Sequence, residues 1–125
     1  MAARPTVLVA DDNADICDLL QVGLSKLAVD VQIANNGREA YEKILAHKPS
    51  LVLLDLVMPE LTGLEVLAKL RETAEFSSLP VIMITARTQD DDIERGFKLG
   101  ATDYVIKPFN LKELMTKAAA ILKLS

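Results

Sequence analysis

The stretch LVLLDLVMP, residues 51–59, places one carboxylate inside an otherwise uncharged run. Seven of its nine residues are large aliphatic side chains or methionine, and Asp55 lies in the middle. A short, nearly continuous apolar run is typical of a parallel strand that is buried on both faces. Whether Asp55 lies within that strand or at its end decides whether it belongs to the core or to a site.

Within this stretch residues 51–55 form the apolar run expected to be a strand, and four further runs of similar length lie at residues 6–10, 29–34, 80–86 and 104–107. The segments between the runs carry apolar residues at helical spacing, as in Ile16, Leu20, Leu24 and Leu27. Five alternations of strand and helix with short connections predict one parallel sheet with helices on both faces, because crossover connections are right-handed. Residues 29–34 alternate between apolar and polar side chains, which predicts an edge strand.

Helix ends are marked by capping residues. Asn110 followed by Glu113 predicts a capping box at the start of the last helix. Residues 88–91 predict another, before the helix that carries Phe97. Gly100 stands where a glycine commonly ends such a helix.

Composition limits the classes of protein. The 125 residues fit one domain, and a hydrophobic content of 50% with 26% charged residues is ordinary for a soluble globular protein. The net charge of −4 offers no basic surface for nucleic acid or an anionic membrane. A single cysteine, Cys17, excludes an intramolecular disulfide, and its expected role is packing. No apolar run is long enough to span a membrane and residues 1–6 do not resemble a signal peptide, so a cytoplasmic location is expected.

Polar residues gather at the carboxyl ends of the predicted strands. The first run is followed by Asp11 and Asp12, the third ends at Asp55, the fourth carries Thr85 and the fifth ends at Lys107. Ligands bind beyond this edge in doubly wound sheets, so Asp55 is predicted to end its strand rather than lie in the core. Each residue alone has a structural explanation, as a helix cap, a turn residue or a lysine that reaches water. Their common placement favours a shared site.

The chemistry of these residues indicates phosphoryl transfer. Three carboxylates repel one another, and a divalent cation with oxygen ligands, Mg²⁺ above all, would relieve that repulsion. A lysine and a hydroxyl beside the cation suit phosphate oxygens. Asp55 is the expected nucleophile, because a carboxylate is already ionised at neutral pH and needs no base. His47, the only histidine, falls at the end of the predicted second helix, where a solvated role is expected.

Four motifs together resemble the receiver domain of two-component response regulators: VADDN (9–13), LVLLDLVMPELTG (51–63), IMITA (82–86) and GATDYVIKPF (100–109). They occur in order at the expected strand ends and span nearly the whole chain. The resemblance implies an α/β, flavodoxin-like, doubly wound sheet of five parallel strands in the order 2-1-3-4-5 with five helices. It implies that residues 1–125 form a single receiver domain.

The resemblance also assigns roles at the site. Asp55 would accept a phosphoryl group from a histidine kinase or a histidine phosphotransfer protein. The Mg²⁺ ion would bind Asp12, Asp55 and the backbone carbonyl of Val57, with Asp11 helping through water. Thr85 and Lys107 would hold phosphate oxygens. The peptide bond between Lys107 and Pro108 would be cis.

A switch is implied by the same resemblance. Thr85 would move toward the phosphoryl group and Tyr104 would fill the space it leaves, so that the face formed by the fourth helix, fifth strand and fifth helix changes for a downstream target. Val57 and Arg87 stand at the positions that tune such sites, and they favour a long-lived phosphoryl group. The protein would be a phosphoacceptor that catalyses only its own phosphorylation and dephosphorylation, with no direct binding of nucleic acid or membrane.

Three other interpretations compete with this one. A phosphatase of the haloacid-dehalogenase type would need a second aspartate where Val57 stands. A degenerate receiver that serves as a scaffold is disfavoured by the intact set of polar residues, and a nucleotide-binding fold lacks the glycine-rich motif after the first strand. The ending ILKLS slightly favours a stand-alone protein over a fragment of a longer regulator. The kinase, the pathway and any phosphorylation-dependent dimer are left open.

Overall fold

The computed structural model describes residues 4–58, 60–86 and 90–123. Its elements follow in the order β1 (Thr6–Ala10), α1 (Ala14–Leu24), β2 (Asp30–Ala34), α2 (Gly37–His47), β3 (Leu51–Asp55), α3 (Gly63–Glu72), a 3₁₀ turn η1 (Ala74–Phe76), β4 (Val81–Ala86), α4 (Asp90–Lys98), β5 (Asp103–Lys107) and α5 (Leu111–Leu122). All strand pairs are parallel, and the order is β2-β1-β3-β4-β5. This confirms the predicted flavodoxin-like fold. In the described ranges no helix combines the length and the apolar character that crossing a membrane requires.

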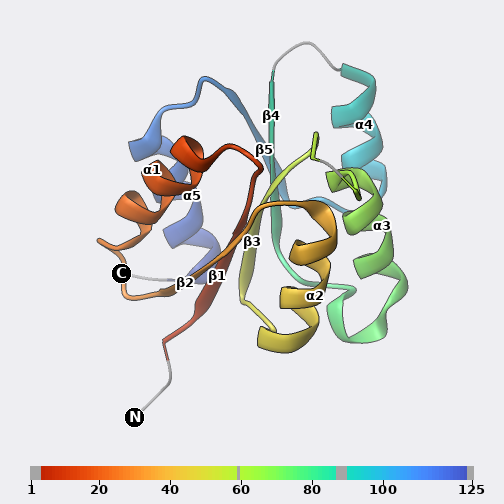
Figure 1. The fold of residues 1–125 in the computed structure, drawn as a ribbon, viewed down its shortest axis with the longest axis horizontal. Helices are drawn as coiled ribbons and strands as arrows, with labels where there is room; N and C mark the ends of the chain where they lie inside the picture. Colours follow the sequence, from red (N-terminus) through yellow and green to blue (C-terminus); the bar gives the residue numbers. More distant parts are fainter. Residues whose placement is uncertain (1–3, 59, 87–89, 124–125) are drawn as a thin grey trace.

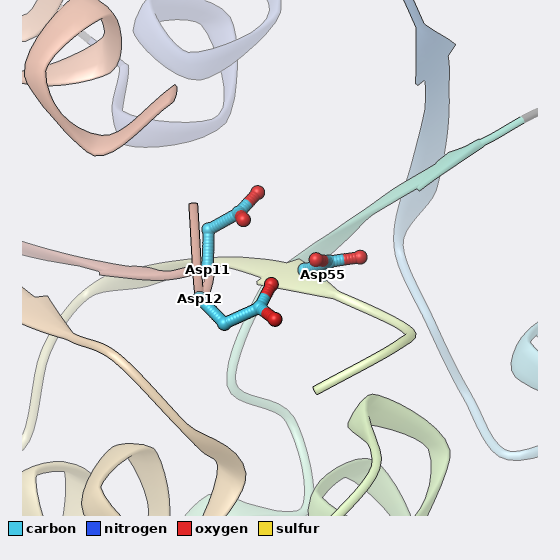
Figure 2. Close-up of side chains that lie close together, drawn as sticks. All are labelled: Asp11, Asp12 and Asp55. Carbon is cyan, nitrogen blue, oxygen red and sulfur yellow. The ribbon is translucent and has the colours of Figure 1, made fainter. Parts of the chain in front are cut away.

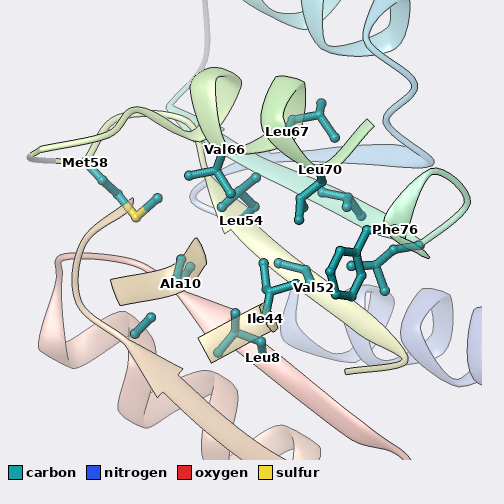
Figure 3. Close-up of a cluster of buried hydrophobic side chains, with 14 residues drawn as sticks. Leu8, Ala10, Ile44, Val52, Leu54, Met58, Val66, Leu67, Leu70 and Phe76 are labelled. Carbon is teal, nitrogen blue, oxygen red and sulfur yellow. The ribbon is translucent and has the colours of Figure 1, made fainter. Parts of the chain in front are cut away.

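The helices form one layer on each face of the sheet (Figure 1). Helices α1 and α5 cover one face, whereas α2, α3 and α4 cover the other. The layers enclose two cores. One lies beneath α2 and α3 and contains Leu8, Ile44, Leu54, Leu67 and Phe76 (Figure 3). The other lies beneath α1 and α5 and contains Val9, Leu20, Leu53, Ile84 and Leu114. Because alternate residues of one strand face opposite cores, the central strands must be apolar throughout.

Caps fix where the helices start. Asn110 accepts a hydrogen bond from the Glu113 N–H at 2.9 Å, but the reciprocal bond of the predicted capping box is not formed within the described residues. The complete box lies instead at Thr62 and Glu65, before α3. The cap predicted at residues 88–91 falls largely outside the described residues.

The two edge strands differ from the central ones. β2 is only partly buried, as the alternation in its sequence predicted. β5 also alternates and exposes Tyr104 and Ile106, which corrects the expectation that residues 104–107 are buried on both faces. The reason is that β5 has one neighbouring strand, β4, within the sheet.

Arg71, near the end of α3, joins segments that meet at the amino edge of the sheet. Its guanidinium donates to the carbonyl oxygens of Phe76 at 2.8 Å and Leu79 at 2.7 Å, on the way to β4. It also donates to the Gly100 carbonyl oxygen through Nη2 at 2.8 Å and Nε at 3.2 Å. Gly100 adopts a φ of 97° and follows α4, as predicted for a glycine at a helix end.

Candidate functional site

Three carboxylates meet at the carboxyl edge of the sheet (Figure 2). Asp11 and Asp12 follow β1, and Asp55 ends the adjacent strand β3. One carboxylate oxygen from each lies within 4.8 Å of the others. Asp55 ends its strand, as predicted. It is also buried, with an exposure of 4%, so the expectation that it lies outside the core is wrong. Asp11 is buried to a similar degree and Asp12 is exposed, so the cluster is open on one side.

Backbone contacts hold Asp11 in place. Its N–H donates to the Ala34 carbonyl oxygen at 3.1 Å, and its Oδ1 accepts from the Asn13 N–H at 2.9 Å. The buried thiol of Cys17 donates to the Asp11 carbonyl oxygen at 3.3 Å. Burial is the main reason why the pKa of Cys17 is raised to about 11, which keeps the thiol protonated. Sequence reasoning placed Cys17 in the packing of α1 and gave no signal for this contact.

Lys107 brings a positive charge to the two buried carboxylates. Its Nζ lies 2.9 Å from Oδ2 of Asp11 and 3.4 Å from Oδ2 of Asp55. Burial lowers the pKa of Lys107, but the adjoining carboxylates outweigh burial, so the pKa is raised and the ammonium stays charged. Lys107 precedes Pro108, and the peptide bond between them is cis.

The pKa of Asp55 is raised to about 6, chiefly because its carboxyl group is buried. The Val57 N–H, which donates to Oδ1 of Asp55 at 3.2 Å, lowers this pKa, the charge of Asp11 raises it, and Lys107 lowers it again. Oδ2 of Asp11 is buried and accepts no well-formed hydrogen bond from the described residues, so its charge is met by the Lys107 ammonium. One ammonium thus faces two carboxylates, and the carboxylate of Asp12 lies beside them. A cluster of oxygen ligands with excess negative charge fits a divalent metal ion.

The other predicted site residues within the described ranges make no hydrogen bond to these carboxylates through their side chains. Thr85 is buried, and its hydroxyl donates to the Ala86 carbonyl oxygen at 3.0 Å rather than to a carboxylate. Tyr104 is 36% exposed and packs edge-on against Phe97, with ring centroids 5.6 Å apart. Val57 is 68% exposed beside Asp55. Arg87 lies outside the described residues.

The raised pKa of Asp55 predicts a pH-dependent stability in the absence of metal. Since the folded state binds this proton more tightly than the unfolded chain, the contribution is full below pH 3.8 and is lost as pH rises through about 6. Asp55→Asn removes the titrating group. In chelator, Asp55→Asn should therefore gain stability relative to the wild type as the pH rises. The difference in free energy of unfolding, variant minus wild type, should be larger at pH 7 than at pH 4.5. Urea unfolding of both proteins measures this, and an equal difference at the two pH values would refute it.

Comparison with known proteins decides the family. The model of the family described as response regulator receiver domain matches residues 7–119. The chain belongs to the response regulator receiver domain family. Receiver domains are phosphoacceptor signalling modules rather than true enzymes, and this one is expected to work with a cognate histidine kinase. The phosphatase and nucleotide-binding interpretations are thereby set aside.

Two transcriptional regulatory proteins are similar to the chain. It is 40% identical over 119 residues to the alkaline phosphatase synthesis transcriptional regulatory protein PhoP of Bacillus subtilis. The aligned region covers 95% of this chain and 49% of that protein. It is 37% identical to the transcriptional regulatory protein SrrA of Staphylococcus aureus, with coverage of 94% and 47%. The chain therefore spans about half the length of these curated relatives.

Solved structures confirm the fold of this receiver. The receiver domain of the Francisella response regulator 1452 superposes with a TM-score of 0.88 at 31% identity, over 96% of this chain and 98% of that chain. The chemotaxis protein CheY4 of Vibrio cholerae superposes with a TM-score of 0.87 at 28% identity, over 95% and 99%.

Proposed function

We propose that this receiver accepts a phosphoryl group on Asp55 from a histidine kinase or a histidine phosphotransfer protein. The observation that carries the proposal is the buried Asp55 carboxylate at the end of β3, with the Lys107 ammonium 3.4 Å away and Asp11 and Asp12 beside it. A carboxylate oxygen of Asp55 attacks phosphorus, a P–O bond forms, and the P–N bond to the donor histidine breaks. The electron pair leaves with the histidine nitrogen.

The residues around Asp55 suit this transfer. Asp11, Asp12, Asp55 and the carbonyl of Val57 would hold Mg²⁺, which neutralises charge on the phosphoryl oxygens when bound. Lys107 already lies between Asp11 and Asp55, so its ammonium needs little displacement to reach a phosphoryl oxygen on Asp55. Thr85 would give up its bond to the Ala86 carbonyl to donate to another oxygen.

The same proposal gives Tyr104 the role of a switch on the surface formed by α4, β5 and α5. Thr85 and Tyr104 lie on adjacent strands, and Tyr104 is now partly exposed against Phe97. A pocket of about 580 Å³ between β5 and the start of α5 includes Tyr104 and Lys117 in its lining. We place the downstream target, or a second copy in a phosphorylation-dependent dimer, on this surface. Membership of the family supports a cytoplasmic location and a single receiver domain over residues 1–125.

Intact mass after incubation with acetyl phosphate and Mg²⁺ tests the proposed function. The wild type should gain one phosphoryl group, and the gain should disappear in chelator and in Asp55→Asn. A second arm uses a phosphorylated histidine kinase as the donor, because some receivers accept only from their kinase. An unmodified wild type in both arms, together with no measurable Mg²⁺ binding, would contradict the proposal and favour a scaffold.

Val57→Asn is expected to shorten the lifetime of the phosphoryl group by about tenfold. This is below the roughly 10²- to 10⁴-fold of general acid–base catalysis, because an amide orients the attacking water without taking its proton. The exposed Val57 side chain cannot orient an attacking water, whereas an amide at the same place can. The decay of the phosphorylated protein, followed by intact mass, gives both rates. Val57→Leu is the control and should leave the lifetime near that of the wild type. Equal decay of the amide variant and the wild type would remove Val57 as a tuning residue.

A further inference from the structure

The connection between β3 and α3 carries Val57 and is closed at its base. The Gly63 N–H donates to the Leu56 carbonyl oxygen at 3.0 Å, so the two ends of the loop are joined. Met58 extends from the loop into the core beneath α2 and α3 (Figure 3). The Val57 N–H donates to Oδ1 of Asp55 at 3.2 Å. The placement of this loop therefore sets where the Val57 backbone lies relative to the Asp55 carboxylate.

The far arm of the loop lies against Gly37, the buried first residue of α2. A Cβ atom at position 37 would fall 1.8 Å from the carbonyl oxygen of Leu61 and 2.5 Å from its carbonyl carbon. Both are backbone atoms, which cannot rotate away as the end of a side chain can. A side chain at position 37 must therefore push the loop and the helix apart.

The start of α2 is itself held in place. The Asn36 side chain accepts from the Glu39 N–H at 2.7 Å, and Oε1 of Glu39 accepts from the Asn35 N–H at 3.1 Å. The preceding strand ends at Ala34, whose carbonyl oxygen accepts from the Asp11 N–H at 3.1 Å. Gly37 is thus tied to the same strand ends as the carboxylates, and a displacement caused at Gly37 falls on the loop.

We propose that Gly37 is a positioning residue of the phosphoryl site, because its missing side chain lets the Leu61 backbone seat against α2 and so places the Val57 backbone. The inference rests on the proposed function in that the Val57 carbonyl is to be a metal ligand. A backbone ligand has no side chain with which to adjust its position, so the contacts of its loop decide the geometry. Residues that orient ligands in this way contribute strongly to metal affinity.

Gly37→Ala tests the proposal. Its Mg²⁺ affinity, measured by calorimetric titration, should be about tenfold weaker than that of the wild type. In the metal-free protein, the NMR shift of the Val57 amide should also move, because its bond to Asp55 is displaced. Gly23→Ala is the matched control. Gly23 is also buried in a helix, but a Cβ there would meet flexible side-chain ends, Cδ1 of Leu111 and Sδ of Met115, both at 3.0 Å. It should leave the Mg²⁺ affinity and the Val57 amide unchanged.

Leu61→Ala distinguishes the backbone contact with Gly37 from the packing of the Leu61 side chain. The variant keeps the Leu61 carbonyl against Gly37 and removes a partly buried side chain, so its Mg²⁺ affinity should stay close to that of the wild type. A loss as large as that of Gly37→Ala would overturn the proposal, as would Gly37→Ala with unchanged affinity and an unmoved Val57 amide.

Folding and the proposed function are judged separately. If Gly37→Ala unfolds at 25 °C, sucrose and a lower temperature are used, and failure to fold there would contradict the proposal, because Gly37 would then serve the whole fold. If the wild type binds no Mg²⁺, the proposed function fails, and the Val57 amide still reports whether Gly37 positions the loop.

Discussion

Lys107→Met is expected to destabilise the metal-free protein by about 3 kcal/mol, and added Mg²⁺ is expected to restore most of that loss. The ammonium lies 2.9 Å from Asp11 and 3.4 Å from Asp55, and both carboxylates are buried. Its removal leaves two neighbouring buried carboxylates with backbone N–H donors but, within the described residues, without the cation that balances their charge. A divalent cation at the same carboxylates can take over this role, so Mg²⁺ should stabilise the variant more than it stabilises the wild type.

Urea unfolding with chelator and with Mg²⁺ measures both effects. Lys117→Met is the matched control, because its Nζ lies 2.8 Å from Oδ2 of Asp103 while both side chains are 33% exposed. A partly exposed pair of this kind contributes about 1 kcal/mol or less. If the two variants lost the same stability, or if Mg²⁺ stabilised Lys107→Met no more than the wild type, Lys107 would not be the residue that balances the buried carboxylates.

Arg71→Met is expected to lower the free energy of unfolding by roughly 2–4 kcal/mol. The guanidinium donates to the carbonyl oxygens of Phe76, Leu79 and Gly100, and within the described residues no other side chain donates to them. Methionine retains most of the length of the side chain and loses every donor. The Leu79 and Gly100 carbonyl oxygens then lose their side-chain donor, whereas that of Phe76 keeps the Leu79 N–H at 3.2 Å.

Arg38→Met is the control for Arg71. Arg38 forms a pair with Glu42 at 3.6 Å in which both side chains are more than half exposed, and its loss should be small. Urea unfolding of both variants, with equal slopes of free energy against urea, permits direct comparison. A cost for Arg71→Met as small as that for Arg38→Met would show that water replaces the guanidinium without penalty.

Much of the fold could be predicted because burial on both faces leaves a direct pattern in the sequence. β1 and β3 coincide with their apolar runs, and the other strands begin within one residue of theirs. The 3₁₀ turn at Ala74–Phe76 was not predicted, because a single turn has no periodicity to detect. The half-buried character of β5 was also missed, since its apolar residues suit either an edge or a central strand.

The candidate site could be predicted in its location but not in its contacts. Strand ends in a parallel sheet share one edge, so the meeting of Asp11, Asp12 and Asp55 follows from topology. The shorter distance from Lys107 to Asp11, the turn of the Thr85 hydroxyl toward Ala86 and the bond from Cys17 depend on side-chain conformations. The close contact between the Leu61 backbone and Gly37 joins residues far apart in the chain, and no spacing rule connects them.

The hydrogen bonds of Arg71 and the cluster of carboxylates lie at opposite ends of the parallel strands. Arg71 bonds to segments that precede β4 and β5, whereas Asp55 and Lys107 close β3 and β5. Mutations near Arg71 are therefore expected to change the stability of the fold without changing the phosphoryl site, whereas mutations at the carboxylate end change both. A laboratory selection for heat tolerance that also requires intact signalling should accumulate changes in the turns near Arg71.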